Sequence, residues 1–154
     1  MLHRVYAVHY TLALMLTESQ VIDAVCAHLR KSGWRIESTC RETERGYDIV
    51  ATHRSKRRRA IIEAKDETSS KSYTLRHGKP FSSGQATSHI SRALYTAIRS
   101  IGHGTLSGMA FPKNEAHVKR VECIAPTLRK LDLEVFWVTS DRKVERAGYW
   151  KHES

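Results

Sequence analysis

The chain has 154 residues, of which 40% are hydrophobic, and carries a formal net charge of +10 at pH 7. This length suits one domain, residues 1–154, and the composition excludes a low-complexity or fibrous protein. The excess of basic residues indicates a polyanionic partner, with nucleic acid the first candidate and an acidic membrane surface the second. Three scattered cysteines argue against a disulfide framework and against structural zinc, and they favour a reduced, cytoplasmic protein.

The first predicted helix covers residues 17–31. Thr17 and Gln20 have the spacing of a capping box, and the apolar positions that follow recur with the helical period. Glu18 precedes Val21 and Ile22 by one turn, so we expect it on the inward side of the helix. The preceding apolar stretch, within residues 1–16, is shorter than the roughly 20 residues of a membrane span and is interpreted as an N-terminal extension or an extra core element.

Three strands are predicted next, at residues 34–40, 46–53 and 59–65. The last two are joined by a short polar turn, so they should form an antiparallel hairpin in which Asp48 lies beside Glu63. Lys65 follows Glu63 by two residues and therefore shares its face of the strand. Two neighbouring carboxylates require a counter-ion, and a divalent cation such as Mg²⁺ meets that need.

The remainder alternates helices and strands. The polar segment 66–83 is longer than most loops, and we expect a flexible flap near Asp48 and Glu63. Helices are predicted at 85–101 and 114–130, with a kink or a split at Pro126. Strands are predicted at 105–111 and 133–139, with an edge strand at 144–150. The apolar stripe of the helix at 85–101 comprises Ala86, Ile90, Ala93, Leu94, Ala97, Ile98 and Ile101.

Gly46-Tyr47-Asp48 and Glu63-Ala64-Lys65 resemble the two motifs of the PD-(D/E)XK nuclease superfamily, and within it the Mrr-type and Holliday-junction-resolvase-like members. Tyr47 stands where the family name has proline. The predicted order of helix, three strands, helix and strand is that of the restriction-endonuclease-like fold. The resemblance, over roughly residues 17–139, thus implies an α/β core with a central mixed sheet flanked by helices, followed here by an additional C-terminal helix and strands. It also suggests a homodimer.

The resemblance implies a set of site residues. Asp48 and Glu63 would be ligands of Mg²⁺ or Mn²⁺, together with the carbonyl oxygen of Ala64, and Lys65 would be the catalytic lysine. Glu18 would be an additional metal ligand, although it equally suits the helix dipole at the N-terminus. Gln85 would complete the site from the start of the second helix, although polar helix faces are more often simply solvated.

The basic residues around this site are predicted to contact phosphates. The function expected from all these features is a Mg²⁺-dependent endonuclease that hydrolyses phosphodiester bonds in DNA, with RNA not excluded. Two alternatives remain: a non-catalytic nucleic-acid-binding module on the same fold, and a basic α/β adaptor in which Glu63 and Lys65 form a surface ion pair. The predicted nucleic-acid-binding residues are Arg54, Lys56, Arg57, Arg58, Lys71, Arg76, Lys79, His89 and Arg92.

Overall fold

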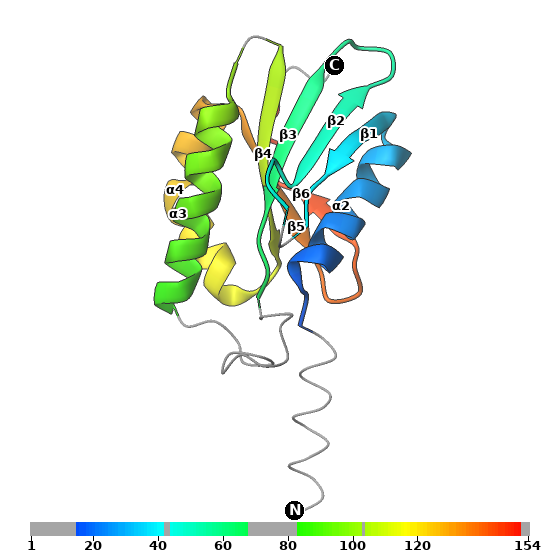
Figure 1. The fold of residues 1–154 in the computed structure, drawn as a ribbon. Helices are drawn as coiled ribbons and strands as arrows, with labels where there is room; N and C mark the ends of the chain where they lie inside the picture. Colours follow the sequence, from blue (N-terminus) through cyan, green and yellow to red (C-terminus); the bar gives the residue numbers. More distant parts are fainter. Residues whose placement is uncertain (1–14, 42–43, 68–82, 103, 152–154) are drawn as a thin grey trace, which may run out of the picture.

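The computed structural model describes residues 15–41, 44–67, 83–102 and 104–151 (Figure 1). These residues form a six-stranded mixed sheet and three helices, which confirms the expected α/β class with a central mixed sheet flanked by helices. The elements in chain order are α2 (Glu18–Lys31), β1 (Trp34–Thr39), β2 (Ile49–His53), β3 (Arg59–Ala64), α3 (Ser83–Ser100), β4 (Thr105–Pro112), α4 (Glu115–Lys130), β5 (Leu133–Val138) and β6 (Val144–Arg146).

The six strands lie side by side in their sequence order. β1, β2 and β3 form an antiparallel meander, β3, β4 and β5 run parallel, and β6 returns antiparallel to β5. Parallel neighbours require crossover connections, which are provided here by α3 and α4. The carboxyl ends of β3 and β4 therefore lie at the same end of the sheet as the first turns of α3 and α4 (Figure 1).

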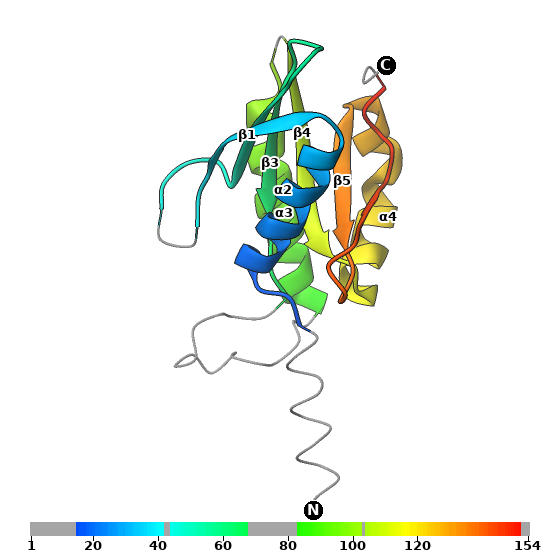
Figure 2. The same cartoon turned by 90° about the vertical axis from the view of Figure 1, so that its right-hand side faces the viewer.

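The sheet divides the core into two layers, each covered by helices. α2 covers one face of the sheet, and α3 and α4 cover the other (Figures 1 and 2). Val25 of α2 belongs to a buried cluster with Ile62, and Ile90 of α3 belongs to a second cluster with Phe111. Complete burial of such a side chain contributes about 1.5–3 kcal/mol, so packing on both faces fixes the sheet between the helices.

The helices agree closely with the predicted ranges. The capping box forms at the start of α2, because the Gln20 N–H donates to Thr17 Oγ1 at 3.3 Å and the Thr17 N–H donates to Gln20 Oε1 at 3.0 Å. α3 begins two residues before the predicted start. The split expected at Pro126 is wrong, since α4 continues through it. Buried Ala125 and Leu128, on either side of Pro126, keep both halves of α4 packed despite the hydrogen bond that proline cannot make.

Several strands are shorter than predicted. β2 begins only at Ile49, because Gly46 has a φ of +142°, a backbone conformation that is not extended and that favours glycine. β1 and β3 each end one residue early. The edge strand predicted at 144–150 is also wrong beyond Arg146: the Ala147 N–H still donates to the Val135 carbonyl oxygen at 2.9 Å, but the next two residues bond to a side chain instead of a strand.

That side chain is Glu134 in β5, which is fully buried. Its Oε1 accepts hydrogen bonds from the backbone N–H groups of Gly148 at 2.8 Å and Tyr149 at 3.2 Å, and its Oε2 accepts one from Arg146 at 2.7 Å. Trp150, at the end of this segment, lies in the core and is 5% exposed. A buried carboxylate is stable only with such partners, so Glu134 fixes the path of this segment.

The last turns of α3 differ from the predicted apolar stripe. Ala86, Ile90, Ala93 and Ala97 are buried, but Ile98 and Ile101 are 46% and 43% exposed. The expectation for these two isoleucines is wrong because Ile98 lies about 100° around the helix from Ala97, and Ile101 lies beyond the final helical residue. None of the helices that the structure describes is long and apolar enough to cross a membrane.

Candidate active site at the open end of the β2–β3 hairpin

The β2–β3 register brings the two motif carboxylates together. Ile49 pairs with Ile62, so Asp48 and Glu63, each one residue farther toward the open end of the hairpin, lie opposite one another. Asp48 precedes β2, and its Oδ2 accepts a hydrogen bond of 2.7 Å from the backbone N–H of Ala64. The backbone of β3 thus holds the Asp48 carboxylate beside Glu63, as the sequence predicts.

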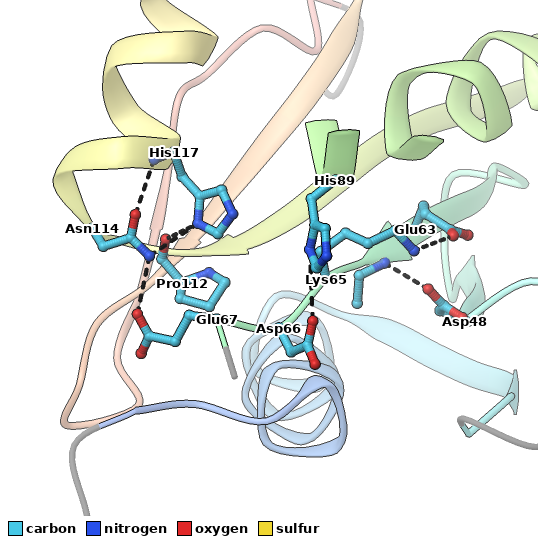
Figure 3. A network of polar contacts seen from close by, with 10 residues as sticks. Asp48, Glu63, Lys65, Asp66, Glu67, His89, Pro112, Asn114 and His117 are labelled. Carbon is cyan, nitrogen blue, oxygen red and sulfur yellow. Dashed lines mark hydrogen bonds and ion pairs between the residues drawn. The ribbon is translucent and has the colours of Figure 1, made fainter. Parts of the chain in front are cut away.

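Glu63 and Lys65 form a nearly buried ion pair. Lys65 Nζ lies 2.6 Å from Glu63 Oε1, and each side chain is 14% exposed (Figure 3). The Lys65 N–H donates to the Ala110 carbonyl oxygen at 3.0 Å, which keeps the residue attached to the sheet after β3 has ended. Burial by itself lowers the pKa of Lys65, but Glu63, followed by Asp48 and Glu18, outweighs burial and leaves that pKa raised. The ammonium group is therefore held in its charged form.

Two other carboxyl groups resist ionisation here. Burial, and then the charge of Glu63, raises the pKa of Asp48 to about 6, although the Ala64 N–H and Lys65 oppose the shift. Burial, and then the charge of Asp48, raises the pKa of Glu18 to about 7. Glu18 therefore lies within electrostatic range of the motif residues, as expected for an inward position in the first turn of α2. Excess negative charge of this kind is relieved either by protons or by a cation.

These donors fit a divalent cation in chemistry but do not converge in this conformation. Among the described residues, no three His, Cys, Asp or Glu side chains are placed so that they could hold a metal ion. Two contacts account for this: Glu63 faces Lys65, and Asp48 is held by the Ala64 N–H. Mg²⁺ needs only one or two carboxylates in addition to substrate and water, so it does not require a cluster of three.

α3 contributes Gln85 and His89 at this end of the sheet. Gln85 is half-buried in the first turn of α3. His89, one turn later, has its Nδ1 atom 3.6 Å from Asp66 Oδ1 (Figure 3). Arg92 is exposed on the following turn. Predicted residues Lys71, Arg76 and Lys79, most of the predicted flap at 66–83 and most of the extension at 1–16 lie outside the described residues.

A second polar group, which sequence reasoning missed, adjoins the motif residues (Figure 3). The Asn114 side chain donates to Glu67 Oε2 at 3.0 Å and caps α4 by accepting from the His117 N–H at 2.9 Å. Glu67 also accepts from the Leu16 N–H at 2.8 Å. A signal was present in the sequence: Glu67 follows Lys65 by two residues, and Asn114 is a capping residue immediately after a strand.

His117 is the most buried member of this group, at 1% exposure. Its Nδ1 lies 3.1 Å from Asn114 Nδ2, and 3.2 Å from the Pro112 carbonyl oxygen across a hydrogen bond. Burial lowers the pKa of His117 although that hydrogen bond opposes the effect. Nε2 has no hydrogen-bond partner among the described residues. A pocket of about 410 Å³, lined by His117, Asn114 and Glu67 with the first turns of α3 and α4, lies beside this group.

The predicted basic turn lies elsewhere. Thr52 pairs with Arg59 at the turn of the hairpin, whereas Asp48 and Glu63 lie at its open end. The expectation that Arg54, Lys56, Arg57 and Arg58 flank the site is therefore wrong. In an antiparallel hairpin, the connecting turn and the open end are separated by the full length of the strands.

Comparison of this chain with models of protein families, with curated proteins and with solved structures gives no match.

Proposed function

We propose that this protein is a Mg²⁺-dependent endonuclease that hydrolyses phosphodiester bonds in DNA, built on a restriction-endonuclease-like fold of the PD-(D/E)XK type. The observation that carries the proposal is the meeting of Asp48, Glu63 and Lys65 at one partly buried position. Burial of two carboxylates of like charge is costly, as the raised pKa of Asp48 shows. Groups with perturbed pKa values concentrate at functional sites. The element order from α2 to β4 supports the choice of fold.

Each residue has a role that follows from its position. Asp48 and Glu63 would hold the ion with the Ala64 carbonyl oxygen, and Glu18 would add a ligand from α2. When bound, Mg²⁺ or Mn²⁺ polarises the phosphate and lowers the pKa of bound water. Lys65, kept charged by its carboxylate neighbours, would stabilise the negative charge that develops on the phosphate oxygens. Gln85 and His89 would orient the water or the phosphate from α3.

One observation favours a non-catalytic nucleic-acid-binding module as a second candidate. Glu63 is in direct contact with Lys65, and the described carboxylates do not converge on one position that could hold a metal ion. If that pair were permanent, Lys65 would only neutralise Glu63, and no ion would bind. The two candidates therefore differ in whether Glu63 leaves Lys65 when Mg²⁺ is added.

The test is cleavage of plasmid, linear duplex, single strand, four-way junction and RNA in Mg²⁺ or Mn²⁺, with EDTA as the blank. Wild type is compared with Lys65→Ala and with Lys143→Ala, in which an exposed lysine of the β5–β6 turn is removed. Cleavage that requires the ion and is lost only in Lys65→Ala supports the nuclease. Equal cleavage by wild type and Lys65→Ala removes the mechanism. Salt-sensitive binding without any cleavage supports the non-catalytic module.

A further inference from the structure

The end of the sheet opposite the candidate active site carries a dense group of cations. It combines the end of α2, the start of β1 and the β2–β3 turn, which meet because Arg35 pairs with Thr52 and the Arg54 N–H donates to the Gly33 carbonyl oxygen at 3.0 Å. Glu37 is the one carboxylate in these segments. We call this group the basic end; its members are Arg30, Lys31, Arg35, Arg54, Lys56, Arg57, Arg58 and Arg59.

Most of these cations have no carboxylate partner. Arg59 pairs with Glu37 at 3.4 Å, and Arg35 also acts on Glu37 electrostatically. The other members make no ion pair with any described residue, and all but the half-buried Arg58 are exposed. The three exposed charges at the tip of the turn, on Arg54, Lys56 and Arg57, are close in sequence and repel one another. Uncompensated like charge of this density attracts polyanions from solution.

The turn that presents the charges is itself well ordered by hydrogen bonds. The His53 N–H donates to the Arg58 carbonyl oxygen at 2.8 Å, which closes the turn. His53 Nδ1 accepts from the N–H groups of Ser55 and Lys56, each at 3.3 Å, and the ring of His53 packs edge-on to Trp34. The backbone is therefore fixed before a ligand arrives, which reduces the entropy lost on binding.

The basic end also has a concave part. A hollow of about 470 Å³ is lined by Arg35, Thr52, His53 and Arg54. The Thr52 hydroxyl already donates to Glu37, so the donors left for phosphate oxygens are the two guanidinium groups, whose planar shape allows paired hydrogen bonds with them. Trp34 is buried and Ile36 half-buried, so these segments offer little apolar surface for insertion into a membrane, which peripheral binding ordinarily requires.

We propose that the basic end is a second contact with the nucleic-acid backbone, separate from the contact with the phosphate that is cleaved. Arg59 and Glu63 lie four residues apart on β3, a distance of about 13 Å along the strand, and the tip of the turn is farther still. One phosphate cannot reach both places, so the substrate is a polymer that extends from one end of the sheet to the other. The inference rests on the proposed function in taking nucleic acid as the polyanion.

The test uses a triple variant, Arg54→Gln, Lys56→Gln and Arg57→Gln, in which all three residues are exposed. Its matched control neutralises three exposed lysines near the opposite edge of the sheet, Lys130→Gln, Lys143→Gln and Lys151→Gln. Binding of a labelled duplex is measured in EDTA over a range of salt concentrations, in the wild-type and in the Lys65→Ala background. Circular dichroism confirms that both triple variants are folded.

We expect the turn variant to bind about tenfold or more weakly near 0.1 M salt and the plot of log K against log salt to flatten by about 2.7, which corresponds to three lost phosphate contacts. The control should lose much less. Equal losses of affinity in both variants would mean that only the net charge of the protein matters, and this would overturn the proposal. Unchanged binding by the turn variant would also overturn it. Binding to vesicles with anionic lipid is measured alongside, and a turn variant that binds the duplex normally but loses vesicle binding would assign the basic end to a membrane and overturn the proposal.

This result is independent of catalysis. If wild type never cleaves but the turn variant alone loses affinity, the nuclease proposal fails and the second contact stands. If wild type cleaves and the turn variant binds normally, the nuclease proposal stands and the second contact fails.

Discussion

The two ends of the β2–β3 hairpin differ in charge and in exposure. At the open end, Asp48 and Glu63 are largely removed from water, and burial raises the pKa of Asp48 to about 6. At the turn, Arg54, Lys56 and Arg57 are exposed. An ionised group is destabilised where it is removed from water and is stable where it remains hydrated. The same two strands thus carry a desolvated cluster of charges at one end and a hydrated one at the other, and if the proposed chemistry and affinity reside at these two ends, mutation should separate them.

The largest effect is expected for Asp48→Asn. Loss of a ligand carboxylate should reduce cleavage by a factor of about 10² to 10⁴, a typical range for a group that acts directly in the reaction. The same change removes repulsion with Glu63 and a buried charge, so the protein should become more stable above pH 6, where wild-type Asp48 is ionised. Initial rates and thermal unfolding at pH 8 measure both effects. Asp141→Asn, at an exposed carboxylate, is the control for cleavage and should leave the rate unchanged.

The next effect concerns the turn. In cleavage assays, the Arg54→Gln, Lys56→Gln, Arg57→Gln variant should raise KM about tenfold while kcat stays close to wild type, because its contacts are as strong in the ground state as in the transition state. Measurement of kcat and KM on one long duplex separates the two constants. A fall in kcat at unchanged KM would contradict the separation of the two ends.

A smaller effect should appear in stability against pH through Glu18. The folded state holds a proton on Glu18 up to a pKa of about 7, whereas the unfolded chain releases it near 4.5. The folded state thus binds more protons between these values, and stability falls as pH rises through that window. Glu18→Gln should remove this loss, a gain of about 1 kcal/mol at pH 8 after allowance for solvent screening and none at pH 4.

Chemical unfolding in EDTA at these two pH values measures the effect. Added Mg²⁺ should reverse the sign of the comparison at pH 8, since an ion bound by Glu18 stabilises the wild type alone. An equal change in stability at pH 4 and pH 8 would contradict the raised pKa.

The smallest effect is expected for Arg57→Gly. Arg57 has a φ of +48°, which costs a residue with a side chain about 1 kcal/mol relative to glycine, although the greater freedom of glycine when unfolded offsets part of this. The free energy of unfolding should therefore stay within about 0.5 kcal/mol of wild type, while the salt dependence of duplex binding falls by about 0.9. Arg57→Gln keeps the side chain and should give the same binding result, which distinguishes charge from backbone conformation.

The features predicted correctly from the sequence depend on short-range rules. Thr17 and Gln20 are three residues apart, and the hairpin register that places Asp48 opposite Glu63 follows from one short turn. The same rule also places the basic turn at the far end of the hairpin, and the prediction that it flanks the site failed because proximity in sequence was taken for proximity in space.

The features that were missed depend on distant parts of the chain. Glu67 and Asn114 are 47 residues apart, and no local pattern links them. The exposure of Ile98 is a different error, because its position about 100° around the helix from buried Ala97 could have been read from the helical period. The roles of Glu18 and Gln85 remain predictions, since position near the motif residues does not establish metal binding.

Glu134 has a consequence for the order in which the protein is made and folded. Its carboxylate is buried in β5, but its partners are Arg146 and the N–H groups of Gly148 and Tyr149. While these later residues are still within the ribosome, burial of β5 would leave the carboxylate with only the neighbouring Val135 N–H as a partner, at a cost of several kcal/mol. Completion of the sheet during synthesis should therefore wait for residues 146–149, even though every other central strand has already emerged.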